Sequence, residues 1–135
     1  MPAPASWSDV RASLFASGGT LDVPLADIEH PRDAGATDSI GLPRGQSEDW
    51  RFPPDAACRG LHVQRFGDTW RAHIDEVHPS CSLIGHARRD APAAYVLGCA
   101  ALGTAVGALA GKAYVGALLG SIFGAASLPT GSRDG

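Results

Sequence analysis

Residues 91–128 read APAAYVLGCAALGTAVGALAGKAYVGALLGSIFGAASL, and this stretch decides the fold. Lys112 is its only charged residue. Four-residue spacing keeps residues near one face of a helix, and a bare glycine face lets a second helix backbone approach closely. The stretch contains two such glycine series, Gly103, Gly107 and Gly111, then Gly116, Gly120 and Gly124. We therefore expect two helices that pack through their glycines.

The spacing between the two series slips from four residues to five, between Gly111 and Gly116. A five-residue step turns the helix face by about 140°, so one continuous helix would not align the glycines. A turn near Lys112 removes the mismatch and folds the block into an antiparallel helical hairpin. The expected register is Gly107 beside Gly120 and Gly103 beside Gly124, with Gly111 and Gly116 in or beside the turn.

Length and polarity favour a membrane location for this hairpin. Residues 92–111 would extend about 30 Å as a helix, enough to cross the hydrocarbon core of a bilayer. Residues 113–127 would extend about 22 Å, which is marginal for a second span. Two spans, or one span with a re-entrant second helix, both fit. A water-soluble helical pair, packed against a sheet or in an oligomer, is the alternative.

Basic residues at the ends of the block predict its orientation. Arg88 and Arg89 precede it and Arg133 follows it. Because positive charges stay on the cytoplasmic side, we expect both ends of the hairpin there. The start of the chain has no charged segment followed by an apolar run, so we expect no signal peptide and a cytoplasmic N-terminal part.

Residues 98–124 resemble the glycine-zipper segments of bacterial membrane-associated proteins. Such segments occur in envelope proteins, in channels and in some toxins that insert into membranes and permeabilise them. The resemblance implies close helix packing in a lipid bilayer and homo-oligomerisation through the glycines, and it implies no particular activity. Residues 1–90 show no resemblance of this kind.

The N-terminal part predicts a small module, so the fold class is α+β. Residues 6–17, within a segment 1–19, have the apolar spacing of a short amphipathic helix. Ser6 is its expected N-cap, with Asp9 three residues on, and Gly18-Gly19 ends it. Residues 20–55 are rich in proline and glycine and predict a loop or linker.

Residues 56–90 predict a β-hairpin module. Alternating runs 61–66 and 69–78 flank a Gly67-Asp68 turn, which is the signature of a hairpin. The alternation points one set of side chains to a core. The other set is expected to face solvent and to bind a small partner: His62, Gln64, Arg71 and His73. After this module we expect Asp90 to cap the next helix with Pro92 in its first turn, and residues 129–135 to be a tail.

The polar residues show little evidence of a nucleic-acid-binding, metal-binding or catalytic site. The net charge is −3 and no basic stripe is present, so we expect no nucleic-acid partner. Cys58, His62, His73, His78, Cys81 and His86 lie near one another in sequence, and His78, Cys81 and His86 are the best metal candidates. Their spacing matches no standard zinc pair, and Asp75 and Glu76 face opposite sides of a strand. We therefore expect no catalytic residues, no bound metal and no cofactor.

The function expected from the sequence is that of a non-enzymatic protein anchored in a lipid bilayer by the glycine-zipper hairpin and oligomerised through it. Two alternatives stay open. The same hairpin suits a pore-forming or membrane-permeabilising protein, since only moderately hydrophobic helices suit a protein that must first be soluble. The second alternative is a soluble metal-binding domain that uses the cysteine and histidine cluster.

Overall fold

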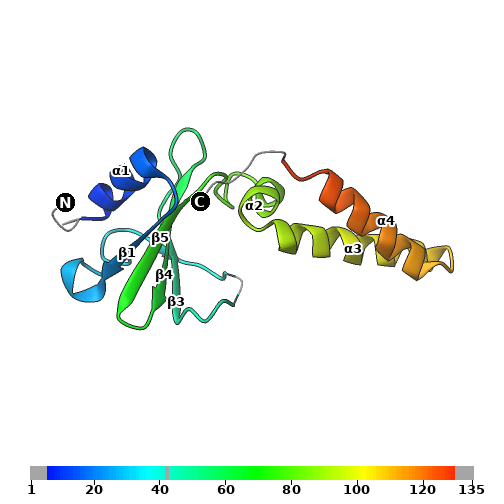
Figure 1. Ribbon diagram of the computed structural model, residues 1–135, viewed down its shortest axis with the longest axis horizontal. Helices are drawn as coiled ribbons and strands as arrows, with labels where there is room; N and C mark the ends of the chain where they lie inside the picture. The colour runs from blue at the N-terminus through cyan, green and yellow to red at the C-terminus, as the bar shows by residue number, and fades with distance from the viewer. Residues whose placement is uncertain (1–5, 42, 130–135) are drawn as a thin grey trace. The chain divides into compact units, whose positions relative to one another are not determined.

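The computed structural model of this protein describes residues 6–41 and 43–129, which divide into two compact units (Figure 1). The sheet unit comprises the described residues up to His78, and the helical unit comprises those from Pro79 onward. The antiparallel sheet together with the helices of the described residues confirms the α+β class.

The sheet unit contains five antiparallel strands in the spatial order β1-β5-β4-β3-β2. The predicted hairpin forms its centre, because β4 and β5 pair across the Gly67-Asp68 turn with Phe66 opposite Thr69. The strands are β1 (Thr20–Pro24), β2 (Thr37–Asp38), β3 (Glu48–Arg51), β4 (Gly60–Phe66) and β5 (Thr69–Asp75).

The expectation that residues 20–55 form a loop or linker is wrong. This segment supplies β1, β2, β3 and the short 3-10 helix η1 (Leu25–Asp27). β1 joins the free edge of β5, and β3 joins the free edge of β4. The strands are short and separated by proline and glycine, so their pattern is weak along the chain. Pairing with the central hairpin stabilises β1 and β3, and β2 pairs with β3.

Helix α1 (Trp7–Ser17) covers one face of this sheet. Its N-cap is Ser6, whose hydroxyl accepts a hydrogen bond from the Asp9 amide, as predicted. Gly18 ends it with φ of 69°, in the left-handed region that glycine tolerates best. The side chains buried between helix and sheet are Trp7, Val10, Leu14, Val23, Ile28, Ala36, Phe52, Leu61, Val63, Trp70 and Ala72.

The helical unit contains α2 (Leu83–Asp90), α3 (Pro92–Leu109) and α4 (Ala113–Ala126). The predicted antiparallel hairpin is confirmed, because α3 and α4 pack along their lengths. Pro92 begins α3 as expected, but Asp90 is not its cap. Asp90 is the last residue of α2, and Ala91 occupies the N-cap position without a side-chain hydrogen bond.

The register of the hairpin differs from the expected one by about one helical turn. Gly103 lies against Gly116 and Gly120, and Gly107 lies against Gly116. Gly124 lies against Val96 and Cys99 rather than Gly103. The reason is a tight turn, in which three residues separate the helices and Gly111 adopts φ of 67°. Gly116 therefore belongs to the helix interface, whereas Gly111 belongs to the turn.

Candidate functional site

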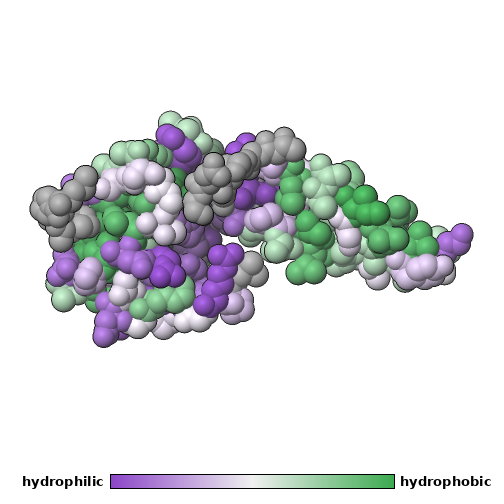
Figure 2. All heavy atoms as spheres, viewed as in Figure 1, coloured by the Kyte–Doolittle hydropathy of each residue, from purple (hydrophilic) through white to green (hydrophobic). Residues whose placement is uncertain are grey.

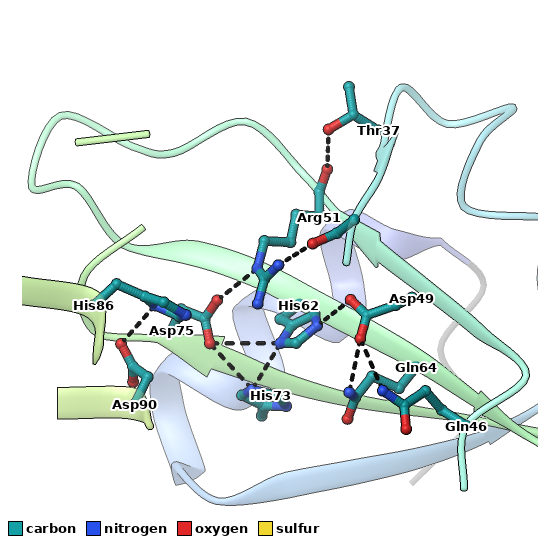
Figure 3. A network of polar contacts seen from close by, with 11 residues as sticks. Thr37, Gln46, Asp49, Arg51, His62, Gln64, His73, Asp75, His86 and Asp90 are labelled. Atoms are coloured by element: carbon teal, nitrogen blue, oxygen red, sulfur yellow. Dashed lines mark hydrogen bonds and ion pairs between the residues drawn. The ribbon is translucent and has the colours of Figure 1, made fainter. Parts of the chain in front are cut away.

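Strand pairing gathers polar side chains on the face of the sheet opposite α1 (Figure 3). In the antiparallel register Asp49 is opposite Gln64, and Arg51 is opposite His62. His62 is in turn opposite His73 on β5, and Asp75 follows His73 by two residues on the same face. This polar network consists of Asp49, Arg51, His62, Gln64, His73 and Asp75.

His62 is the centre of the network and is only 5% exposed. Its Nε2 lies 2.6 Å from Oδ1 of Asp49. The other Asp49 oxygen accepts a hydrogen bond of 2.9 Å from the Gln64 side-chain amide. Asp49 is also buried, and the segment before β3 closes over it, because a Cβ at Gly41 would collide with its carboxylate.

The other ring nitrogen of His62 belongs to a triangle of donor atoms. His62 Nδ1 lies 3.1 Å from His73 Nε2 and 3.6 Å from Asp75 Oδ1. His73 Nε2 lies 3.1 Å from the same Asp75 oxygen. Asp75 is fully buried, and its second oxygen accepts a hydrogen bond of 3.1 Å from Arg51 Nε. The Arg51 guanidinium also donates to the Ser39 hydroxyl.

The network favours the charged forms of Asp49, His62 and Asp75. Burial would raise the pKa of Asp75, but hydrogen bonds from His62 and His73 outweigh burial and lower it. Burial would likewise raise the pKa of Asp49, and the hydrogen bonds from His62 and Gln64 lower it instead. Burial would lower the pKa of His62, yet its bonds to Asp49 and Asp75 raise it. The sheet unit thus holds a histidine between two buried carboxylates.

The expectation that His62 and Gln64 face solvent is therefore wrong, since both side chains are buried. His73 is half-buried and Arg71 is exposed. Arg71 binds the Asp22 carboxylate through two hydrogen bonds of 2.9 and 3.1 Å. This face is consequently not the open polar surface for a partner that the alternation predicts.

The metal candidates from the sequence lie in different units. His78 ends the sheet unit, with its amide 2.6 Å from the Cys58 carbonyl and its ring packed against Gly60. Cys81 is disulfide-bonded, so its sulfur is not available as a thiolate ligand. His86 pairs with Asp90 within α2 at 3.2 Å.

Sequence reasoning missed the role of Asp75, although a signal for it exists. A two-residue turn at Gly67-Asp68 fixes the hairpin register, so it places His62 opposite His73. The alternation of a strand then puts Asp75 on the same face as His73. Two histidines and one carboxylate are thus predictable neighbours from hairpin geometry alone.

The second candidate site is the surface of the α3–α4 hairpin. Among the described residues of α3 no side chain is buried, and in α4 only Gly124 is. Figure 2 shows hydrophobic residues covering much of this surface. The exposed large apolar side chains of the two helices are Leu97, Leu102, Val106, Leu109, Tyr114, Leu118, Leu119, Ile122 and Phe123. α3 is long and apolar enough to cross a membrane, and α4 is a shorter apolar helix.

Polar contacts mark the end of the hairpin next to α2. The Arg88 guanidinium donates to the Ser127 carbonyl just beyond α4, where a cation complements the helix dipole. The Tyr95 hydroxyl lies 3.0 Å from the Ser127 hydroxyl. At the opposite end, the turn carries Lys112, and the exposed ring of Tyr114 follows it.

Comparison of the chain with protein-family models, with curated proteins and with solved structures found no significant match.

Proposed function

We propose that this is a membrane protein in which the α3–α4 hairpin inserts into a lipid bilayer and the sheet unit is held at the bilayer surface. The observation that carries the proposal is the inverted burial of the hairpin. Its interior consists of glycine backbone, and its outer surface consists of exposed leucine, valine, isoleucine and aromatic side chains. An apolar patch of this extent is rare on a water-soluble monomer and is the normal exterior of a membrane helix pair.

The dimensions and the ends of the hairpin support the proposal. The 18 residues of α3 extend about 27 Å, close to the thickness of the hydrocarbon core. Arg88 and Tyr95 lie at one end, and Lys112 and Tyr114 at the other. Tyrosine side chains are enriched at both interfaces of a bilayer, and lysine and arginine near helix ends extend to the interface, so the spacing of these residues matches a buried segment between two polar boundaries.

Self-association through the glycines stays a prediction, and the packing of α3 against α4 within one chain limits how it can occur. Gly103, Gly107, Gly116 and Gly120 already contact the partner helix of the same chain. A zipper between chains would require α3 and α4 to separate, whereas an oligomer of intact hairpins would use the leucine-rich outer surface. Chemical crosslinking in detergent, with and without Gly103→Leu, distinguishes a glycine zipper between chains from an oligomer of intact hairpins.

Charge substitutions on the exposed surface test insertion. We expect the full chain to stay in the membrane pellet after an alkaline carbonate wash. Leu102→Arg combined with Leu119→Arg should release it, because each arginine costs about 2.5 to 3.5 kcal/mol at the middle of a membrane helix. In a water-soluble helical pair the same side chains are exposed, so the changes would be neutral.

A matched control uses the sheet unit. Ile40 is a fully exposed apolar residue there, and Ile40→Arg should leave the chain in the pellet. Wild-type protein that appears in the soluble fraction would exclude the anchor. A version that ends at Asp90 should be soluble in every case.

A pore-forming or permeabilising role is the second candidate, favoured by the shortness of α4. Its 14 residues extend about 21 Å, less than a bilayer core, so α4 would thin the bilayer or enter it only in part. Dye release from liposomes tests this role. Anchoring without leakage at high protein-to-lipid ratio would leave the anchor as the function.

The side of the membrane on which the sheet unit lies is also testable. Arg88 and Arg89 favour a cytoplasmic position. The disulfide state of Cys81 favours an oxidising compartment instead. Labelling with a membrane-impermeant thiol reagent in intact cells, before and after reduction, distinguishes the two positions.

A further inference from the structure

Three donor atoms in the sheet unit converge on one point. His62 Nδ1, His73 Nε2 and Asp75 Oδ1 form a triangle with sides of 3.1, 3.1 and 3.6 Å (Figure 3). A tetrahedral zinc ion with bonds of 2.0 to 2.1 Å holds its ligand atoms about 3.3 Å apart. The triangle therefore has the size of three corners of such a coordination sphere, and its atoms are those of a possible cation site.

With both imidazoles neutral, this triangle holds at most one proton, that of His73 Nε2. His62 Nε2 faces the Asp49 carboxylate at 2.6 Å, so the proton of a neutral ring lies there. His62 Nδ1 then directs a lone pair toward a carboxylate oxygen that has no proton to offer. The Nε2–H of a neutral His73 can bond either His62 Nδ1 or Asp75 Oδ1, and a metal cation in its place would contact all three atoms.

The surroundings are those of a metal site with outer support. A histidine ligand commonly donates its second N–H to a carboxylate, which orients the ring. Asp49 stands in that position beside His62, and Gln64 holds Asp49 in turn. Arg51 binds the Asp75 oxygen that points away from the triangle. The two buried members of the triangle are thus each fixed by a further side chain.

We propose that His62, His73 and Asp75 bind a divalent transition-metal ion of the zinc class. Two imidazole nitrogens and one carboxylate oxygen suit zinc, and three protein ligands are the number that leaves a fourth position for water or substrate. This site differs from the one that the sequence suggests, because it uses neither His78, Cys81 nor His86. It is independent of the hairpin and of its insertion into a bilayer.

Zinc binding to the tag-free full chain tests the proposal directly. Elemental analysis after dialysis, and titration of apoprotein with zinc chloride, should give about one equivalent bound. His73→Ala removes one ligand at a half-exposed position and should lower the affinity at least about 100-fold. His30→Ala is the matched control, since His30 pairs with Glu48 on the other face of the sheet, and it should bind zinc like wild type.

A second variant separates metal binding from folding. Asp49→Asn keeps the shape of the side chain that orients His62 and should lower zinc affinity about 10- to 100-fold. Circular dichroism and fluorescence of the buried Trp70 report whether each variant is folded. The spectrum of bound cobalt(II) should show tetrahedral coordination in wild type and lose it in His73→Ala.

Two results would overturn the proposal. Wild-type protein that binds no zinc at 100-fold molar excess would show that the triangle is held by protons alone. Stoichiometric binding that is the same in folded His73→Ala or Asp75→Asn as in wild type would place the metal elsewhere in the chain.

Discussion

In the sheet unit apolar side chains are inside and the buried side chains of Asp49, His62, Gln64 and Asp75 are hydrogen-bonded, whereas in the helical unit the large apolar side chains face outward and glycine backbone is inside. Trp70 and Val63 are at most 1% exposed, while Leu102 on α3 is 68% exposed. Large apolar side chains are thus buried in the sheet unit and exposed in the helical unit of the same chain. The outer surface of the helical unit thus has the composition that the proposed membrane insertion requires, whereas the sheet unit has an ordinary apolar core.

This difference determines which interactions stabilise each unit. The sheet unit depends on apolar side-chain burial, at about 25 cal/mol for each Å² removed from water. The hairpin depends on close backbone approach, which small residues permit. Substitutions that remove side-chain volume should therefore harm one unit, and substitutions that add it should harm the other.

The largest expected effect is Trp70→Ala in the sheet unit. Trp70 packs edge-on against Trp7 at 6.2 Å and against His30 at 5.2 Å. We expect a loss of about 3 to 5 kcal/mol in the free energy of unfolding, measured by urea denaturation with tryptophan fluorescence. Leu102→Ala in the helical unit is the contrast, and it should leave that unfolding transition unchanged because Leu102 is exposed.

A loss of stability from Leu102→Ala comparable to that from Trp70→Ala would contradict the comparison. It would mean that the outer surface of the hairpin is buried in the protein as it exists in solution, by a second copy or by the sheet unit.

Adding volume at Gly103 should produce the next largest effect. A Cβ there would collide with the Gly116 carbonyl and approach the Gly120 Cα to 3.0 Å. We expect Gly103→Leu to destabilise the α3–α4 pair by about 3 kcal/mol, seen as faster proteolysis within 100–112 in detergent. Gly98→Leu is the matched control on the same helix, because no atom lies within 4 Å of its added Cβ. Equal proteolysis of the two variants would show that the glycine contacts do not hold the helices together.

The sequence predicts the hairpin of helices and the hairpin of strands, because both have strong local patterns. Glycine spacing predicts the two helices and the turn between them, but not their register. The register follows from how tightly residues 110–112 turn, and a turn of three residues shifts the contact of Gly103 from Gly124 to Gly116 and Gly120. Turn geometry depends on backbone angles, and the spacing of glycines along the sequence does not determine those angles.

The strands at the edges of the sheet are not predictable in the same way. β2 has two residues and β3 has four, too few to show an alternation. β3 forms because β4 offers a free edge, and β2 then pairs with β3, which are tertiary effects. The pairing of β3 with β4 brings Asp49 and Arg51 beside His62, so two of the six residues of the polar network depend on contacts that the local sequence does not reveal. The His62, His73 and Asp75 triangle depends only on the predicted hairpin.

Acid should lower the free energy of unfolding of the sheet unit, by a smaller amount than Gly103→Leu destabilises the α3–α4 pair. Burial would raise the pKa of Glu48, but hydrogen bonds from Arg65, Trp50 and His30 lower it from 4.5 to about 2. A carboxylate with a lowered pKa in the folded state contributes stability above the unfolded value, and this stability is lost as pH falls from about 4.5 to about 2. We expect Glu48 to account for about 1 to 2 kcal/mol, since the side chain is partly exposed.

Chemical denaturation at pH 6 and pH 3 measures this loss, and Glu48→Gln should reduce the difference between the two values. Residues 79–129 contain Asp90 as their only carboxylate side chain, so the hairpin should respond less to acid. A Glu48→Gln variant with the same acid sensitivity as wild type would assign the effect to other carboxylates.

The smallest expected effect compares the start of α1 with the starts of the two hairpin helices. In the helical unit α2 has a side-chain cap of its own, because the Ser82 hydroxyl accepts from the Gly85 amide. α1 has a side-chain cap, because the Ser6 hydroxyl accepts from the Asp9 amide at 3.2 Å and lies 2.8 Å from the Asp9 carboxylate. The N-cap residues of α3 and α4 are Ala91 and Lys112, whose side chains make no such bond. Ser6→Ala should therefore cost about 1 kcal/mol in thermal or urea unfolding of the sheet unit, whereas Lys112→Ala should leave the helix content of the hairpin in detergent unchanged. If Lys112→Ala lowered the stability of the hairpin as much as Ser6→Ala lowers that of the sheet unit, the start of α4 would depend on the Lys112 side chain. Nothing in the position of Lys112, in a tight turn at the end of an apolar hairpin, leads us to expect this.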